Sequence, residues 1–184
     1  RVAPALAGMG LLEAIPEATI LANADPDDAN HDGISGRPNH VWDVAKQATV
    51  VGRFGWKANQ HGIRQQNAGA FIGDMGITSA MFGIEQCSPT QEKCTTSLTG
   101  PTPQLRADIG FSVDYYVFTL GVPGRRDIDA PATQRGRELF HQNGCASCHT
   151  VTMVTGDSAE FPETAHQTIH PYSDLLLHDM GPEL

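Results

Sequence analysis

The chain has 184 residues, of which 40% are hydrophobic, and its formal net charge is −9. Such an acidic chain is poor in the Lys/Arg patches that bind phosphates, so we expect no nucleic-acid partner. No apolar run approaches the ~18 residues that a membrane span requires, so no span is expected. The length fits one domain or parts of two, and the 19 glycines and 12 prolines predict many loops and short helices.

In chain order, the hydrophobic pattern predicts short helices separated by loops. The predicted helices cover 17–21, 59–72, 105–120 and 133–143. A β-hairpin is predicted at 40–43 and 49–51. The segments 86–104 and 150–171 are expected to be irregular, and 172–178 to form one or two turns. We find no repeat of fixed period.

The most informative motif is Cys145-Ala146-Ser147-Cys148-His149. C-x-x-C-H is the attachment signature of c-type haem. The two thiols add to the vinyl groups of the porphyrin, and the histidine supplies one axial ligand of the iron. We expect the second ring nitrogen of His149 to donate to a carbonyl, which would fix the tautomer of the ring.

Two other interpretations of this motif remain open. A zinc site would need a second pair of ligands, but the other two cysteines, Cys87 and Cys94, lie far upstream. A thioredoxin-type dithiol follows a strand, whereas 133–143 is helical in pattern. The order of elements also matches the way tandem cytochrome c domains are joined. One helix ends near Leu120, a linker follows, and a second helix leads into C-x-x-C-H.

Several further motifs accompany this one across the chain. They are Gly10-Leu-Leu-Glu-Ala-Ile-Pro16, Asp32-Gly-Ile-Ser-Gly36, Gly52-Arg-Phe-Gly-Trp-Lys57, Gly73-Asp-Met-Gly-Ile-Thr78, Gly144-Cys-Ala-Ser-Cys-His-Thr150 and Pro171-Tyr-Ser-Asp-Leu-Leu-Leu-His-Asp-Met-Gly181. Together they resemble the bacterial di-haem oxidoreductase family, also labelled peroxidase or thiol oxidoreductase and distantly similar to the di-haem cytochrome c peroxidases. The resemblance implies a periplasmic or envelope protein with two covalent haems and mostly α-helical domains.

We therefore expect a mainly α, cytochrome c-like fold with tandem haem domains, a long irregular insertion and a calcium-type loop. Residues 1–122 would form the distal part of a first domain, 123–131 a linker, and 132–184 the start of a second domain that carries C-x-x-C-H. On this interpretation the first haem motif precedes Arg1. The chain is then a piece of a longer precursor, and the remainder or another chain is a partner.

The loop that begins at Asp28 has side-chain oxygens at alternate positions, followed by Gly33. This pattern is the first half of an EF-hand-type loop. The predicted calcium ligands are the side chains of Asp28, Asn30 and Asp32 and the carbonyl of Ile34. Asn39 replaces the terminal glutamate, so another ligand would come from Asp25, Asp27 or Asp43. Resemblance to di-haem peroxidases also implies calcium; the alternative is a solvated acidic turn.

Cys87 and Cys94 are close neighbours in the sequence. In an oxidising compartment such neighbours usually pair, so we predict a disulfide with a modest stabilising effect, because its ring is short. The alternative is a pair of free thiols.

The distal ligand of the iron is sought after the motif, among Met153, His166, His170, His178 and Met180. His178 and Met180 are favoured because they belong to the family-like run before Gly181. A methionine ligand suits electron transfer, and an open position suits peroxide chemistry. The alternative is that they line the haem pocket or hold a loop.

Other candidates carry weaker signals. Trp42, Trp56, Tyr115 and Tyr116 are candidate electron relays or core residues. Arg53, Lys57 and Arg64 are candidate partners of the haem propionates or ordinary surface charges. Asp74 and Glu85 are candidates for acid–base work on a bound peroxide.

The leading functional prediction is a c-type haem oxidoreductase in the bacterial envelope. It would take single electrons from a small donor protein and reduce peroxide or a related oxidant. One alternative is an electron-transfer cytochrome without catalysis. Another is a calcium-stabilised structural or binding module.

Overall fold

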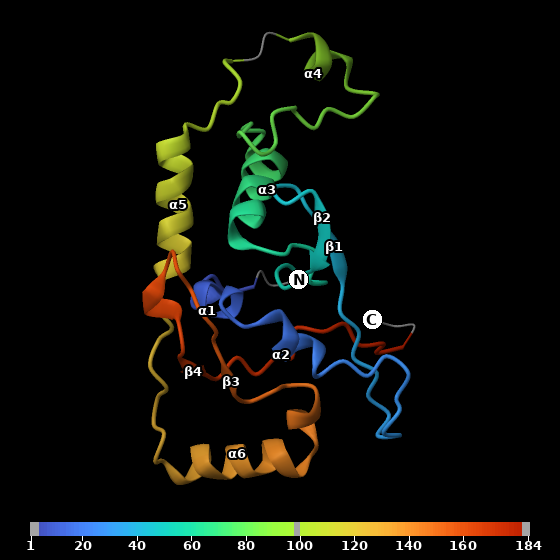
Figure 1. Cartoon of the computed structure of the whole chain (residues 1–184), viewed down its shortest axis with the longest axis vertical. Coiled ribbons are helices and arrows are strands. Elements are labelled where there is room, and N and C mark those ends of the chain that lie inside the picture. Colours follow the sequence, from blue (N-terminus) through green and yellow to red (C-terminus); the bar gives the residue numbers. More distant parts are fainter. Residues whose placement is uncertain (1–3, 98–99, 182–184) are drawn as a thin grey trace.

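The computed structural model describes residues 4–97 and 100–181. Short helices and two small antiparallel sheets are joined by long loops (Figure 1). The elements are α1 (Met9–Glu13), α2 (Glu17–Leu21), β1 (His40–Asp43), β2 (Ala48–Val51), α3 (Ile63–Met75), α4 (Glu92–Thr96), α5 (Ala107–Thr119), α6 (Pro131–Gln142), η1 (Cys145–Ser147), β3 (Met153–Val154), η2 (Pro162–Thr164) and β4 (Thr168–Ile169). The fold is therefore mixed, which corrects the expectation of a mainly α chain.

The predicted helices are confirmed with shifted ends. The segment expected to form a helix over 59–72 forms α3, which begins after the extended Gly62 and ends at Gly76 in the left-handed conformation (φ 69°). Helix α6 starts at Pro131, since proline suits the first helical position. Helix α2 has the predicted bounds, and the pattern over 105–120 corresponds to α5.

Other elements were missed or predicted wrongly. Helices α1 and α4 were not predicted, and the β3–β4 hairpin lies in a segment expected to be irregular. Residues 172–178 form no helical turn. Tyr172 and Leu175 adopt left-handed conformations (φ 51° and 62°), and Leu177 exchanges hydrogen bonds of 2.9 and 2.8 Å with Arg37.

The predicted first hairpin is confirmed. Strands β1 and β2 pair antiparallel, with Asp43 opposite Ala48. The buried Asp43 Oδ1 accepts hydrogen bonds of 2.9 Å from the backbone N–H groups of Ala45 and Lys46, which holds the turn. This role of Asp43 is local to the hairpin.

One hydrophobic cluster forms where α1, α3 and α5 meet. Its buried members are Met9, Phe54, Ile63, Val117, Phe118 and Phe161. The rings of Phe118 and Phe161 stack at 4.1 Å. Helix α1 approaches α5 so closely that a Cβ atom on Gly10 would lie 2.0 Å from the Phe118 carbonyl oxygen.

A second cluster lies between α2, the first hairpin and the β3–β4 hairpin. Its buried members are Ile15, Ile20, Val51, Met153, Ile169 and Leu176. Both clusters combine residues from before 122 with residues from after 150, so the chain returns to its first part after the haem motif. The division at 123–131 stays a prediction, and the segments on its two sides share these cores.

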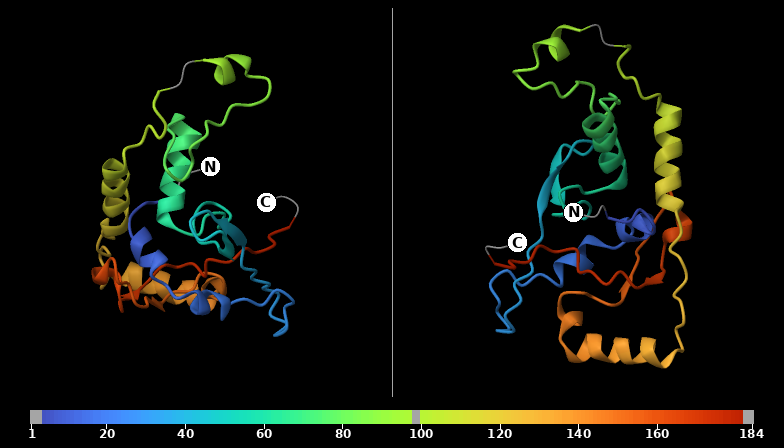
Figure 2. Two further views of the ribbon diagram at one scale, coloured as in Figure 1. Left: turned by 45° about the horizontal axis from the view of Figure 1, so that its top comes forward. Right: turned by 180° about the vertical axis from the view of Figure 1, so that it is seen from behind.

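Two segments lie at the ends of the molecule, away from the body that the two hydrophobic clusters form. Figure 2 shows the loop around α4 at one end and α6 at the opposite end. Within the described segments, no helix is long and apolar enough to cross a membrane.

Candidate haem-attachment site

The C-x-x-C-H motif forms a single tight turn at the end of α6. Gly144 adopts a left-handed conformation (φ 75°), and η1 follows at once. The His149 N–H donates to the Cys145 carbonyl at 3.0 Å, which closes the turn. Cys145 is exposed, Cys148 is half-buried, and both thiols are free. The turn thus presents two thiols and one imidazole together.

The His149 ring is held by a residue 23 positions downstream. Its Nδ1 lies 2.9 Å from the carbonyl oxygen of Tyr172. Because a carbonyl only accepts, Nδ1 carries the proton and Nε2 keeps a lone pair for a metal. The ring of Phe140 lies 6.1 Å from His149 and 5.4 Å from Tyr172, measured between centroids. The predicted hydrogen bond to a carbonyl is confirmed.

The two alternative interpretations of the motif gain no support. Among the described residues, Cys145, Cys148 and His149 belong to no group of three ligand atoms close enough to share a zinc ion. Burial, followed by the nearby carboxylates of Asp174 and Asp32, raises the pKa of the Cys148 thiol. A reactive dithiol depends on a lowered thiol pKa, so the environment of Cys148 opposes that chemistry.

Two cavities share Arg125 and Tyr172, and the carbonyl of Tyr172 is the partner of His149. Neither cavity is lined by Cys145, Cys148 or His149 themselves. The larger, of about 560 Å³, is walled mainly by apolar residues of α1, of the segment after α5 and of β4. The smaller, of about 190 Å³, faces α6 and includes Phe140. Cofactor sites have this apolar character with a few polar groups. The donor set and the adjoining apolar space fit a haem.

Helix α6 is amphipathic, but none of its residues is buried. Leu139 is 39% exposed, and Phe140 is half-buried. An amphipathic helix is stable in a protein mainly through the cover on its apolar face. A porphyrin bound at the adjacent thiols would supply part of that cover.

The distal candidates lie in different environments. His178 Nε2 is 2.7 Å from the buried Asp174 Oδ2. One of the two ring nitrogens of His178 is therefore already engaged by a carboxylate. Met180 is 67% exposed, and Met153 is buried in the second cluster. The exposed His166 faces Asp157 at 2.9 Å.

His170 is the distal candidate that lines the larger cavity. Its Nδ1 lies 3.2 Å from the Val151 carbonyl oxygen. Among the described residues, no hydrogen bond or ion pair joins two of the five candidates. The identity of the distal ligand therefore stays a prediction.

The acidic loop turns its oxygens toward its own backbone. Asp28 accepts from Gly33 N–H at 3.1 Å, Asp32 from Ile34 N–H at 2.8 Å, and Asp25 from Ala29 N–H at 2.9 Å. Asp43 is committed to the hairpin turn. In the described segments these acids form no group of three with ligand atoms in mutual reach. The calcium ligands, including Asn30 and Ile34, stay a prediction.

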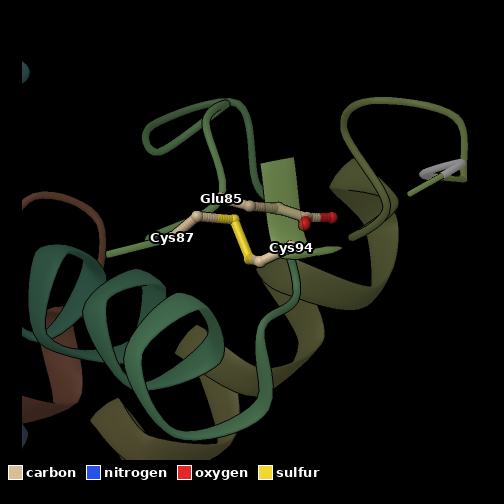
Figure 3. A group of neighbouring side chains, drawn as sticks. All are labelled: Glu85, Cys87 and Cys94. Carbon is tan, nitrogen blue, oxygen red and sulfur yellow. A yellow bond between two sulfur atoms is a disulfide. The ribbon is translucent and has the colours of Figure 1, made fainter. Parts of the chain in front are cut away.

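The predicted disulfide is confirmed. Cys87 and Cys94 are bonded, with their Cα atoms 5.7 Å apart, and Glu85 lies beside them (Figure 3). This group belongs to the α4 end of the molecule. Glu85 and Asp74 line neither cavity, so their geometry lends no support to acid–base work there.

The candidate relay aromatics are exposed. Trp42, Trp56, Tyr115 and Tyr116 expose half or more of their surface, so the core interpretation is wrong for them. None of the four lines either of the two cavities described above.

Two of the three candidate propionate partners, Arg53 and Arg64, are engaged elsewhere, and Lys57 lines neither cavity. Arg53 donates to the carbonyls of Leu12, Glu13 and Ile15, and burial lowers its pKa. Arg64 pairs with Glu160 and Asp114. Arg125, which sequence reasoning assigned to a linker, lines both cavities, and Arg137 lines the smaller one.

The comparisons with known proteins agree with the motif. The family described as "Di-haem oxidoreductase, putative peroxidase" matches residues 1–184, so the chain belongs to this di-haem oxidoreductase family. No curated protein and no solved structure matches the chain.

Proposed function

We propose that this chain carries a covalent c-type haem and serves an oxidoreductase that moves single electrons in the bacterial envelope. The observation that carries the proposal is the His149–Tyr172 hydrogen bond of 2.9 Å beside two free thiols. Membership of a di-haem oxidoreductase family supports the same chemistry.

Each residue of the site then has a defined task. Cys145 and Cys148 would form the thioether bonds, and His149 Nε2 would ligate the iron, which supplies one-electron redox chemistry when bound. The Tyr172 carbonyl holds the proton on Nδ1 and so increases the donor strength of Nε2. Phe140 and the apolar wall of the larger cavity would help to exclude water from a bound porphyrin.

Peroxide, or a related oxidant, is the proposed terminal acceptor, and a small redox protein the proposed donor. The family description and the exposed position of the motif support electron transfer from such a donor to such an oxidant. His178 and Met180 remain the proposed distal-side residues. Because Asp174 engages His178, iron binding by its Nε2 would require that pair to separate.

The proposed arrangement of the whole protein follows the sequence pattern. Residues 1–122 would complete a first haem domain, 123–131 would connect, and 132–184 would open a second. The remainder of a longer precursor, or another chain, would pack against the exposed apolar side chains of α6. Calcium bound by the acidic loop would stabilise the first of these domains.

The test uses the chain produced in a host that matures c-type cytochromes. Covalent haem on a denaturing gel and the spectra of the oxidised and reduced forms establish the cofactor. Adding peroxide to the reduced protein then measures turnover. Rapid reoxidation with consumption of peroxide is the expected result, and bare thiols at Cys145 and Cys148 would overturn the proposal.

Two results would select the alternatives. A low-spin, six-coordinate spectrum unchanged by peroxide would select an electron-transfer cytochrome. Absence of haem, combined with thermal stability that falls when calcium is chelated, would select the calcium-stabilised module.

A further inference from the structure

We propose that Arg125 binds a propionate carboxylate of the haem attached at Cys145 and Cys148. This inference rests on the proposed function, because it presupposes a covalent haem at the motif. It adds a positioning residue that ties the carboxylate edge of the porphyrin to the segment between α5 and α6.

The position of Arg125 is the first argument. It lines both the cavity of about 560 Å³ and the cavity of about 190 Å³, a place it shares only with Tyr172 among the described lining residues. The wall of the larger cavity is mostly apolar, and the smaller cavity places Phe140 of α6 beside the polar Arg137 and His141. This combination of apolar wall and cation is complementary to a haem, which has an apolar ring and two carboxylates on one edge.

The unused donors of Arg125 are the second argument. A guanidinium has five N–H donors in a planar fork that fits a carboxylate. Arg125 makes one long hydrogen bond, of 3.4 Å, to the Tyr172 hydroxyl, and no carboxylate of the described segments pairs with it. Five of the other described arginines bond a carboxylate or a carbonyl, namely Arg37, Arg53, Arg64, Arg106 and Arg135. Within the described segments Arg126 and Arg137 also have free donors, as Arg125 does, but Arg126 lines neither cavity and Arg137 only the smaller one.

The link to the motif is the third argument. Tyr172 accepts from Arg125 with its hydroxyl and from His149 Nδ1 with its carbonyl. A carboxylate held by Arg125 would therefore lie beside the residue that orients the proximal imidazole. The guanidinium would offset the negative charge of the propionate near the iron and favour the reduced state, since removing a nearby positive charge stabilises the more positive ferric form.

The experiment compares haem-loaded wild-type protein with Arg125→Gln, Arg125→Lys and Arg126→Gln. Arg126 is the matched control, because it is the next residue and is exposed like Arg125 but lines neither cavity. The readouts are covalent haem on a denaturing gel, the midpoint potential and the propionate bending band in the resonance Raman spectrum. None of these depends on enzymatic activity.

We expect Arg125→Gln to keep its covalent haem and to shift the propionate band. At a fixed applied potential its ratio of oxidised to reduced haem should rise about fivefold, the size expected from one partly exposed charge. Arg125→Lys should recover part of the shift, because it keeps the charge but not the fork. Arg126→Gln should match the wild type.

A wild-type potential and an unshifted band in Arg125→Gln would overturn the inference. If that variant fails to fold, Tyr172→Phe replaces it, since it removes the hydroxyl and keeps the carbonyl. It should shift the potential in the same direction by a smaller factor, and no shift would overturn the inference. Absence of covalent haem in the wild type itself would instead refute the proposed function.

Discussion

The body of the molecule and the haem-motif end are built in opposite ways. In the body, the cluster of α1, α3 and α5 buries Ile63 completely and its neighbours almost completely, and the second cluster buries Ile20 completely. At the motif end, α6 has an apolar stripe but no buried residue, and Cys145 and His149 are exposed. The first region buries two apolar clusters within the polypeptide, although side chains such as Phe111 and Tyr115 stay exposed there, whereas α6 buries no residue at all.

The difference teaches where to look for a ligand. Burial of apolar area stabilises a fold by about 25 cal/mol per Å², so an uncovered amphipathic helix forgoes that contribution. In this chain the uncovered helix leads directly into the residues that can bond a porphyrin. Incomplete packing and the attachment motif therefore coincide, and each supports the interpretation of the other.

The strongest test of this difference between the two regions replaces each cysteine pair by serines in turn. We expect Cys145→Ser with Cys148→Ser to abolish covalent haem, because serine hydroxyls do not form the thioether bonds. Cys87→Ser with Cys94→Ser is the matched control and should keep its haem, since this pair lies at the α4 end. A haem stain and the absorption spectrum check both variants, and retained covalent haem in the first would contradict the prediction.

The next largest effect contrasts a body residue with an α6 residue. Ile20→Ala should lower the free energy of unfolding by about 2–5 kcal/mol, with or without haem, because Ile20 is 0% exposed. Leu139→Ala should cost under about 0.5 kcal/mol in haem-free protein, as for other surface positions. In the haem-loaded protein its cost should rise to about 1–2 kcal/mol, because the porphyrin covers the side chain.

Urea unfolding of both variants, each with and without haem, measures these four values. An equal cost of Leu139→Ala in the two forms would show that haem does not cover α6. Ile20→Ala serves as the control for a residue whose cover comes from the polypeptide itself.

Local patterns explain what could be predicted from the sequence. The C-x-x-C-H spacing predicted the attachment turn, and the expected carbonyl partner of His149 is confirmed. Helix periodicity located α3, α5 and α6 within a few residues. These features depend on neighbours along the chain, which the sequence displays directly.

Long-range contacts explain what was missed. Tyr172 contacts His149 across 23 residues, and Arg125 reaches Tyr172 across 47, with no spacing signal for either. Arg53 was a candidate propionate partner, but its guanidinium donates to the carbonyls of Leu12 and Glu13 in α1. These residues lie 41 and 40 positions earlier in the chain. The two-residue strands β3 and β4 are too short to give a period of their own.

A smaller effect is expected from the disulfide at the α4 end. Reduction of Cys87–Cys94, or its replacement by serines, should lower the free energy of unfolding by about 2 kcal/mol, because the ring it closes is short. Thermal unfolding with and without a phosphine reductant measures the change. Reductant should leave the unfolding temperature of the double serine variant unchanged, and a further drop in that variant would point to a different thiol.

The smallest predicted effect is a pH dependence from the body. Burial lowers the pKa of His61 from 6.5, although Asp43 at 3.1 Å opposes the shift. The folded state therefore binds this proton more weakly than the unfolded state, and stability should fall as the pH falls from about 6.5 toward the lowered value. His61→Gln should flatten unfolding temperature against pH in this range, whereas His166→Gln, at an exposed histidine, should retain the slope. Equal slopes in wild type and His61→Gln would mean that other groups control acid sensitivity.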